Sequence, residues 1–72
     1  MNLKESTLKA LEDMNVWANY IDVYNYMVNN NYNVGKSKTP EKSVASELYK
    51  YGEAGVIEKR KNGALPEYKA KK

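Results

Sequence analysis

Apolar residues recur at helical spacing in three stretches of the chain, and each stretch predicts an amphipathic helix. In the first, the apolar arc lies opposite a charged face, and Asn2 with Glu5 has the spacing of a capping box. We therefore expect a helix at about 3–14. Its core-facing residues are Leu3, Thr7, Leu8, Ala10, Leu11 and Met14.

The second stretch predicts a helix at about 20–29, where Asn19 and Asp22 form a weaker cap. Its core-facing residues are Tyr20, Ile21, Val23, Tyr24, Met27 and Val28. Tyr26 should point outward. Residues 15–18 break the helical period with a β-branched and an aromatic residue. They predict a short strand between the first two helices, with Trp17 as a core residue.

A strong helix start follows a loop at about 30–38. Thr39 can cap the helix and Pro40 suits its first position, so we expect the third helix at about 40–54, closed by Gly55. Its core-facing residues are Val44, Ala45, Leu48 and Tyr51.

Beyond Gly55 the apolar period changes from that of a helix to that of a strand. Residues 56–60 and 65–68 can pair as a hairpin across Asn62-Gly63, a dipeptide that favours a type I′ turn. Ile57, Leu65 and Tyr68 should face the core, and Pro66 places the second strand at an edge. Lys69, Lys71 and Lys72 should form a frayed basic tail.

The composition narrows the class of protein. With 72 residues there is room for a single domain, 1–72, with one core. The chain has no cysteine and no histidine, which removes the thiolate nucleophile, the usual general base and the commonest metal ligands. We therefore expect no enzyme, no cofactor and no metal site. No apolar run is long enough to span a membrane, and we expect a cytoplasmic protein.

Charge is distributed unevenly along the chain. Residues 1–34 carry two lysines and four acids, a net −2, whereas residues 35–72 carry ten basic residues and five acids, a net +5. In one small domain this division predicts a basic face, which attracts polyanions. A lysine-rich solvated surface with no partner is the simpler alternative.

Three helices followed by a hairpin, with a strand between the first two helices, form an α+β arrangement that resembles a winged helix-turn-helix. The segment KTPEKSVASELYKYGEAGVIEKR is similar to the HARE-HTH family, whose third helix opens with Thr-Pro and buries a Val and a Leu. Here these residues are Thr39, Pro40, Val44 and Leu48. The resemblance implies DNA binding, often as a module of a larger system, although one relative in bacterial RNA polymerase acts through protein contacts. The nine-residue link between helices two and three, longer than in a classical helix-turn-helix, suits this family.

The first hypothesis is binding of double-stranded DNA, with the third helix in the major groove and the basic wing on the phosphate backbone. The chain would then be a small transcription regulator or the DNA-reading part of a larger system, and it would be associated with the nucleoid. Arg60 is the residue best suited to a bidentate phosphate contact. Glu47 and Glu53 on the same helix restrict which side of it can approach DNA. The residues expected to contact DNA are Lys36, Lys38, Thr39, Lys42, Ser43, Ser46, Tyr49, Lys50, Lys59, Arg60, Lys61 and Asn62.

Two other interpretations compete with DNA binding. Tyr26, Tyr32 and Tyr49 could anchor a protein partner or a homodimer. For most of the seven tyrosines the simpler interpretation is a ring packed partly into the core with its hydroxyl group in solvent. Glu67-Tyr68-Lys69 has the E-x-K spacing found in nuclease sites. That spacing is common by chance, and a complete site needs a further carboxylate for which a single hairpin offers no obvious place.

Overall fold

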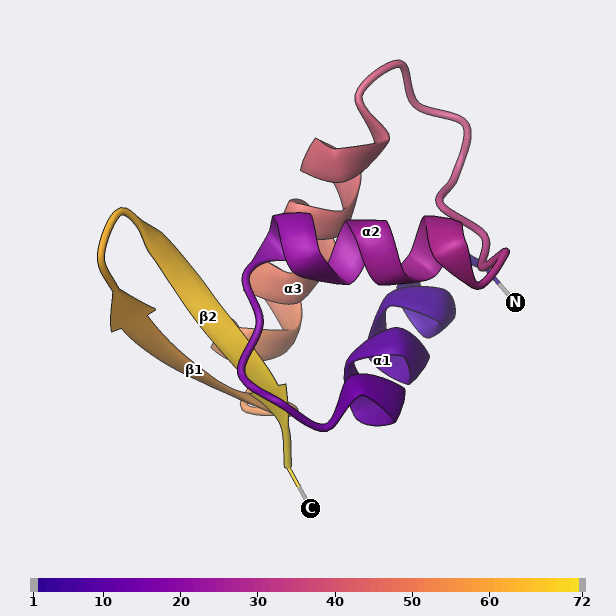
Figure 1. Cartoon of the computed structure of the whole chain (residues 1–72). Coiled ribbons are helices and arrows are strands. Elements are labelled where there is room, and N and C mark those ends of the chain that lie inside the picture. Colours follow the sequence, from indigo (N-terminus) through magenta and orange to yellow (C-terminus); the bar gives the residue numbers. More distant parts are fainter. Residues whose placement is uncertain (1, 72) are drawn as a thin grey trace.

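Three helices precede a two-stranded antiparallel hairpin in the computed structural model, which describes residues 2–71 (Figure 1). The elements are α1 (Leu3–Met14), α2 (Tyr20–Asn29), α3 (Pro40–Glu53), β1 (Ile57–Asn62) and β2 (Leu65–Ala70). This is the expected α+β layout of a winged helix. Within residues 2–71 there is no helix with the length and apolar character needed to cross a bilayer.

Local hydrogen bonds set the starts of α1 and α2. The Asn2 side chain accepts from the Glu5 backbone at 2.8 Å, and the Glu5 carboxylate accepts from the Asn2 backbone at 3.3 Å, so the capping box is complete. Asn19 caps α2 by accepting from the Asp22 backbone at 2.9 Å. Each bond satisfies a backbone donor that a helix start would otherwise leave free.

The predicted cap of α3 is wrong, although the helix begins at Pro40 as expected. Thr39 has φ −126° and ψ 70°, and its side chain makes no capping hydrogen bond. The Thr39 N–H instead donates to Ser37 Oγ at 3.1 Å, in a turn of the preceding loop. Because Pro40 has no N–H and its φ already suits a helix, α3 can begin without a side-chain cap.

The core lies between the three helices and the inner face of the hairpin. Its buried hydrophobic residues are Ala10, Leu11, Ala18, Val23, Met27, Val44, Leu48, Tyr51, Ile57, Tyr68 and Ala70. Ala45 is only half-buried. The buried arc of α2 is narrower than its apolar pattern predicts, since Ile21 and Val28 are 43% and 46% exposed. Tyr26 does not point outward as expected. Its side chain packs against the core, and its ring meets the Tyr32 ring edge-on with 6.0 Å between the ring centroids.

Residues 15–18 form a single β-bridge rather than the expected strand. Ala18 and Tyr68 exchange backbone hydrogen bonds of 2.9 and 2.8 Å, which tie the segment to the free edge of β2. Trp17 was expected in the core but is only half-buried, and the Arg60 guanidinium lies 4.3 Å from its ring centroid. The bridge aligns only Ala18 with the sheet, so the neighbouring side chains remain at the surface.

The hairpin turns one residue later than predicted. Asn62 pairs with Leu65, which leaves Gly63 and Ala64 as the two-residue loop. Gly63 has φ 69°. Ala64 does not have a positive φ, because the non-glycine residues with positive φ among those described are Asn15 and Asn31. A type I′ turn needs positive φ at both loop positions, so glycine first and alanine second correspond to type II′.

At the other end of the hairpin β2 extends two residues beyond its predicted end at 68, whereas β1 begins at Ile57, one residue later than predicted. Lys69 lies in β2 opposite Glu58, and Ala70 pairs with Ile57 and is buried. The expected frayed tail is therefore wrong for Lys69, and Lys72 lies outside the described residues.

A glycine sets how closely the hairpin approaches α3. A Cβ at Gly52 would lie 3.2 Å from Lys59 Cδ and 3.4 Å from Tyr68 Cε1. The absence of a side chain at Gly52 therefore lets β1 and β2 pack tightly against the C-terminal half of α3.

The contrast between neighbours on α2 is testable. Met27 is fully buried, so Met27→Ala should lower the free energy of unfolding by about 2–5 kcal/mol. Val28→Ala should change it by less than about 0.5 kcal/mol, because Val28 is 46% exposed at the surface. Urea denaturation followed by circular dichroism measures both values. Equal losses would show that Val28 belongs to the core.

Candidate nucleic-acid interface

The exposed side of α3 carries four of the five helix residues that were expected to contact DNA, together with Glu53. At ~100° per residue, Lys42, Ser46, Tyr49 and Glu53 fall within one narrow stripe, and Lys50 lies beside it. All five side chains are exposed, and that of Tyr49 is 58% exposed. Ser43, also expected at the interface, is half-buried on the flank of the helix. The stripe is therefore centred opposite Val44 and Leu48, which hold α3 in the core.

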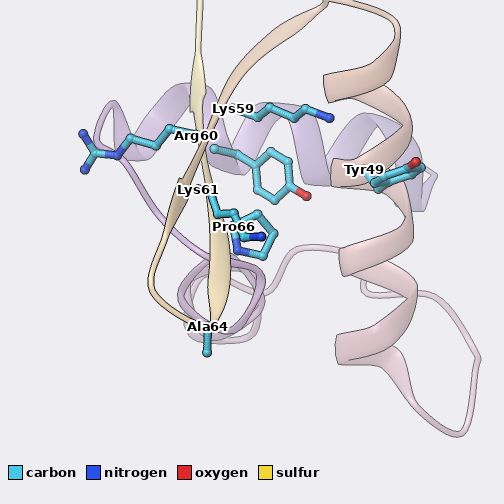
Figure 2. Close-up of a pocket in the computed structure, with 7 residues that line it drawn as sticks. Tyr49, Lys59, Arg60, Lys61, Ala64 and Pro66 are labelled. Carbon is cyan, nitrogen blue, oxygen red and sulfur yellow. The ribbon is translucent and has the colours of Figure 1, made fainter.

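Strand alternation divides the basic run of the wing between two faces. Lys59 and Lys61 share the face that carries Ile57, Tyr68 and Ala70, and this face looks toward α3. Arg60 and Asn62 lie on the opposite face, and Figure 2 shows Arg60 reaching away from Tyr49. The three consecutive cations therefore do not form one continuous basic surface.

Lys59 is engaged by groups of α3. Its ammonium forms an ion pair with the Glu53 carboxylate and lies 5.5 Å from the centroid of the Tyr49 ring. The hydrogen bond with Glu53 raises the pKa of Lys59. A phosphate at this position would have to compete with Glu53 for the same ammonium.

Arg60 is held by its own hairpin and by Trp17. Its Nε donates to Glu67 Oε1 at 2.9 Å, and Nη2 lies 2.8 Å from the same oxygen. The hydrogen bond from Arg60, and next the one from Asn62, lowers the pKa of Glu67. With Trp17 against the guanidinium, Arg60 and Asn62 are placed to stiffen the wing rather than to reach a separate ligand.

Lys61 is the wing cation that forms no ion pair with a described residue. It lies on the rim of a groove of about 360 Å³ between α3 and the wing. Figure 2 shows Tyr49 on one side of this groove and Lys59, Lys61 and Pro66 on the other.

The loop before α3 adds further positive charge near the N-terminal end of the helix. Lys36 and Lys38 are exposed and form no ion pair with another residue of the described chain. Thr39 is exposed beside them, and its carbonyl accepts from the backbone of Lys42 at 3.0 Å and of Ser43 at 3.2 Å. The loop, the start of α3 and Lys42 thus form a cationic end of the molecule.

Two of the three acids of α3 lie toward its other end, whereas Glu41 is half-buried in its first turn. Glu47 is 3.9 Å from Lys50, and Glu53 pairs with Lys59. The tip of the hairpin points toward the N-terminal end of α3 (Figure 1). A polyanion therefore meets least repulsion at the N-terminal half of α3 and the wing tip, where Lys42 and Lys61 lie.

Two of the three tyrosines considered as protein anchors have roles inside the fold. Tyr26 and Tyr32 contact each other, and the Tyr32 hydroxyl donates to the Asp13 carboxylate of α1. Tyr49, in contrast, is exposed and borders the groove. An aromatic interface would therefore have to be centred on Tyr49, on the same surface as the lysines.

The three residues of the E-x-K motif each have a different environment in the hairpin. Glu67 is bound to Arg60, Tyr68 is buried, and Lys69 lies opposite Glu58 in the hairpin. Within residues 2–71, no group of three or more acidic, histidine or cysteine side chains is arranged to hold a metal ion.

Sequence reasoning missed the acidic partners of the wing cations and one wall of the groove. The pairing of Arg60 with Glu67 requires the strand register, which depends on the turn at Gly63-Ala64. With the turn placed earlier, Arg60 would face Leu65. The ion pair of Glu53 with Lys59 crosses between two elements, so no local spacing indicates it.

The contact between Tyr32 and α1 gives a pH prediction. The hydrogen bond to Asp13 raises the pKa of Tyr32 from 10.0 to about 12. A raised pKa favours the folded state below pH 10, and this contribution is lost as the pH rises toward 12. Asp13→Asn should return the Tyr32 pKa toward 10, whereas Glu12→Gln should leave it high. Carbon-13 NMR of the tyrosine ring measures both, and a wild-type pKa near 10 would contradict the contact.

No protein-family model matches the chain, and comparisons with curated proteins and with solved structures find no significant match. The similarity to the HARE-HTH family at Thr39, Pro40, Val44 and Leu48 therefore stays a prediction. In the structure Val44 and Leu48 are buried and Thr39 does not cap the helix. A function has to be inferred from the cationic side of α3 and the wing.

Proposed function

We propose that this protein is a DNA-binding winged-helix module that docks the N-terminal half of α3 in the major groove. The observation that carries the proposal is the exposure of Lys42 and Ser46 on α3 and of Lys61 on the neighbouring wing, where neither lysine forms an ion pair with a described residue. An α-helix fits the major groove of B-DNA, and lysine and serine side chains reach both base edges and phosphates.

The wing makes a smaller contribution than three consecutive basic residues would suggest. Lys61 is available to a phosphate, Lys59 becomes available when it leaves Glu53, and Arg60 keeps the hairpin rigid through Glu67. Lys36 and Lys38 extend the contact along the backbone of the duplex from the other side of α3. A single recognition helix reads a short site, so high specificity would require a second copy or an attached domain.

Salt dependence of duplex binding tests the electrostatic part of the proposal. Roughly four to six neutralised phosphates give a slope of about −4 to −5 for log affinity against log salt concentration. Fluorescence anisotropy with a labelled random duplex at several salt concentrations measures this slope. A slope near zero would overturn the proposal.

Single lysine variants locate the interface. Lys42→Ala and Lys61→Ala should each weaken duplex binding and reduce the magnitude of the salt slope by about one. Lys9→Ala is the matched control, because Lys9 is tied to Asp13 on α1, away from the wing (Figure 1). If Lys9→Ala weakens binding as much as Lys61→Ala, the contact is not confined to this face.

Glu53 should act as an internal competitor of DNA. Glu53→Gln removes a negative charge and releases Lys59, so duplex affinity should rise roughly two- to five-fold at low salt. The double variant Lys59→Glu, Lys61→Glu should abolish duplex binding. A partner held by the Tyr49 ring alone would survive that double variant, which distinguishes protein binding from DNA binding.

A further inference from the structure

The groove between α3 and the wing has two kinds of wall. One wall is the exposed ring of Tyr49, and the wing opposite it contributes Ala64 and Pro66. Tyr68 also lines the groove. Its volume of about 360 Å³ is at the lower end of the ~300–1,000 Å³ typical of small-molecule sites. The groove is therefore large enough for a planar ring but small for a folded peptide segment.

The Tyr49 ring has a cation beside it but is not covered. The Lys59 ammonium lies 5.5 Å from its centroid, and the side chain is still 58% exposed. In Figure 2 the ring is seen nearly edge-on with Lys59 to one side of it, while Lys61 and Pro66 lie to the other side. An aromatic ring with open surface is a platform on which a flat ligand can stack.

The rim of the groove is cationic. Lys61 forms no ion pair with a described residue, and Lys59 has only one exposed carboxylate, that of Glu53, as its partner. A ligand that complements this groove has a planar aromatic ring and negative charges attached to its edge. A nucleotide of a DNA strand has both.

We propose that the groove binds an unpaired nucleobase of a DNA strand, stacked on Tyr49, with the adjoining phosphates held by Lys61 and Lys59. This inference rests on the proposed function. Bases inside an intact duplex are stacked on both faces and cannot lie against Tyr49. The groove therefore selects a strand end, a gap or a single-stranded segment next to the duplex that α3 contacts.

The test compares two single-stranded probes that differ only in their bases. One is a short oligothymidylate, and the other is an abasic oligomer of the same length and charge. Stacking of a base on an aromatic side chain predicts that the wild-type chain binds oligothymidylate roughly 5- to 150-fold more tightly. Fluorescence anisotropy measures both affinities at one salt concentration. Equal affinities would overturn the inference.

Variants locate the stacking surface. Tyr49→Ala should remove the preference for oligothymidylate, whereas Tyr49→Phe should retain it because the ring is kept. Tyr49 is exposed, so both variants should keep the wild-type unfolding temperature. Ile21→Ala, an exposed apolar residue of α2, is the control and should keep the preference. A preference that survives Tyr49→Ala would place the base elsewhere and contradict the assignment.

Duplex binding measured in parallel separates this inference from the proposed function. Salt-dependent duplex binding without a preference for oligothymidylate would overturn the groove assignment alone. A Tyr49-dependent preference for oligothymidylate without duplex binding would support the groove and overturn docking of α3 in a major groove. If the chain binds neither the oligothymidylate probe nor the duplex, both the proposed function and the groove assignment are overturned.

Discussion

The wing is held in place by one backbone contact, the β-bridge between Ala18 and Tyr68. Two hydrogen bonds of 2.8 and 2.9 Å join the α1–α2 connection to β2, and the Tyr68 side chain is buried beside Gly52 of α3. An isolated two-stranded hairpin is only marginally stable in water. The bridge and the buried face of the hairpin therefore provide its stability, and they also decide which wing side chains face α3.

The positive charge of the wing is partly compensated inside the protein. Glu53 and Glu67 each pair with a wing cation, so the local positive charge is smaller than the sequence run Lys59-Arg60-Lys61 implies. Exposed pairs of this kind contribute little to stability. Their larger effect is on position, because Arg60 is held against Trp17 and Lys59 against Tyr49. Preorganised side chains lose less conformational freedom when a ligand binds.

The two proposals assign different tasks to the two ends of α3. The N-terminal half, where Lys42 and the two loop lysines outnumber the single acid Glu41, suits a duplex backbone. Farther along the helix Tyr49 borders the groove beside the wing, where a ring and a cation are presented together. A module of this design would combine sequence-independent attraction to phosphates with selection for an unpaired base.

Local chemistry was sufficient to predict the three helices and the hairpin of this fold. Asn2 with Glu5, Asn19 with Asp22 and Pro40 lie where the helices begin, because capping and the proline ring act within a few residues. The exposed side of α3 followed from its period in the same way. Tertiary structure decided the rest: Ile21 and Val28 are exposed because the neighbouring helices cover only part of α2. The register, the partners of Lys59 and Arg60, and the groove at Tyr49 depend on contacts between residues distant in sequence, which no local pattern contains.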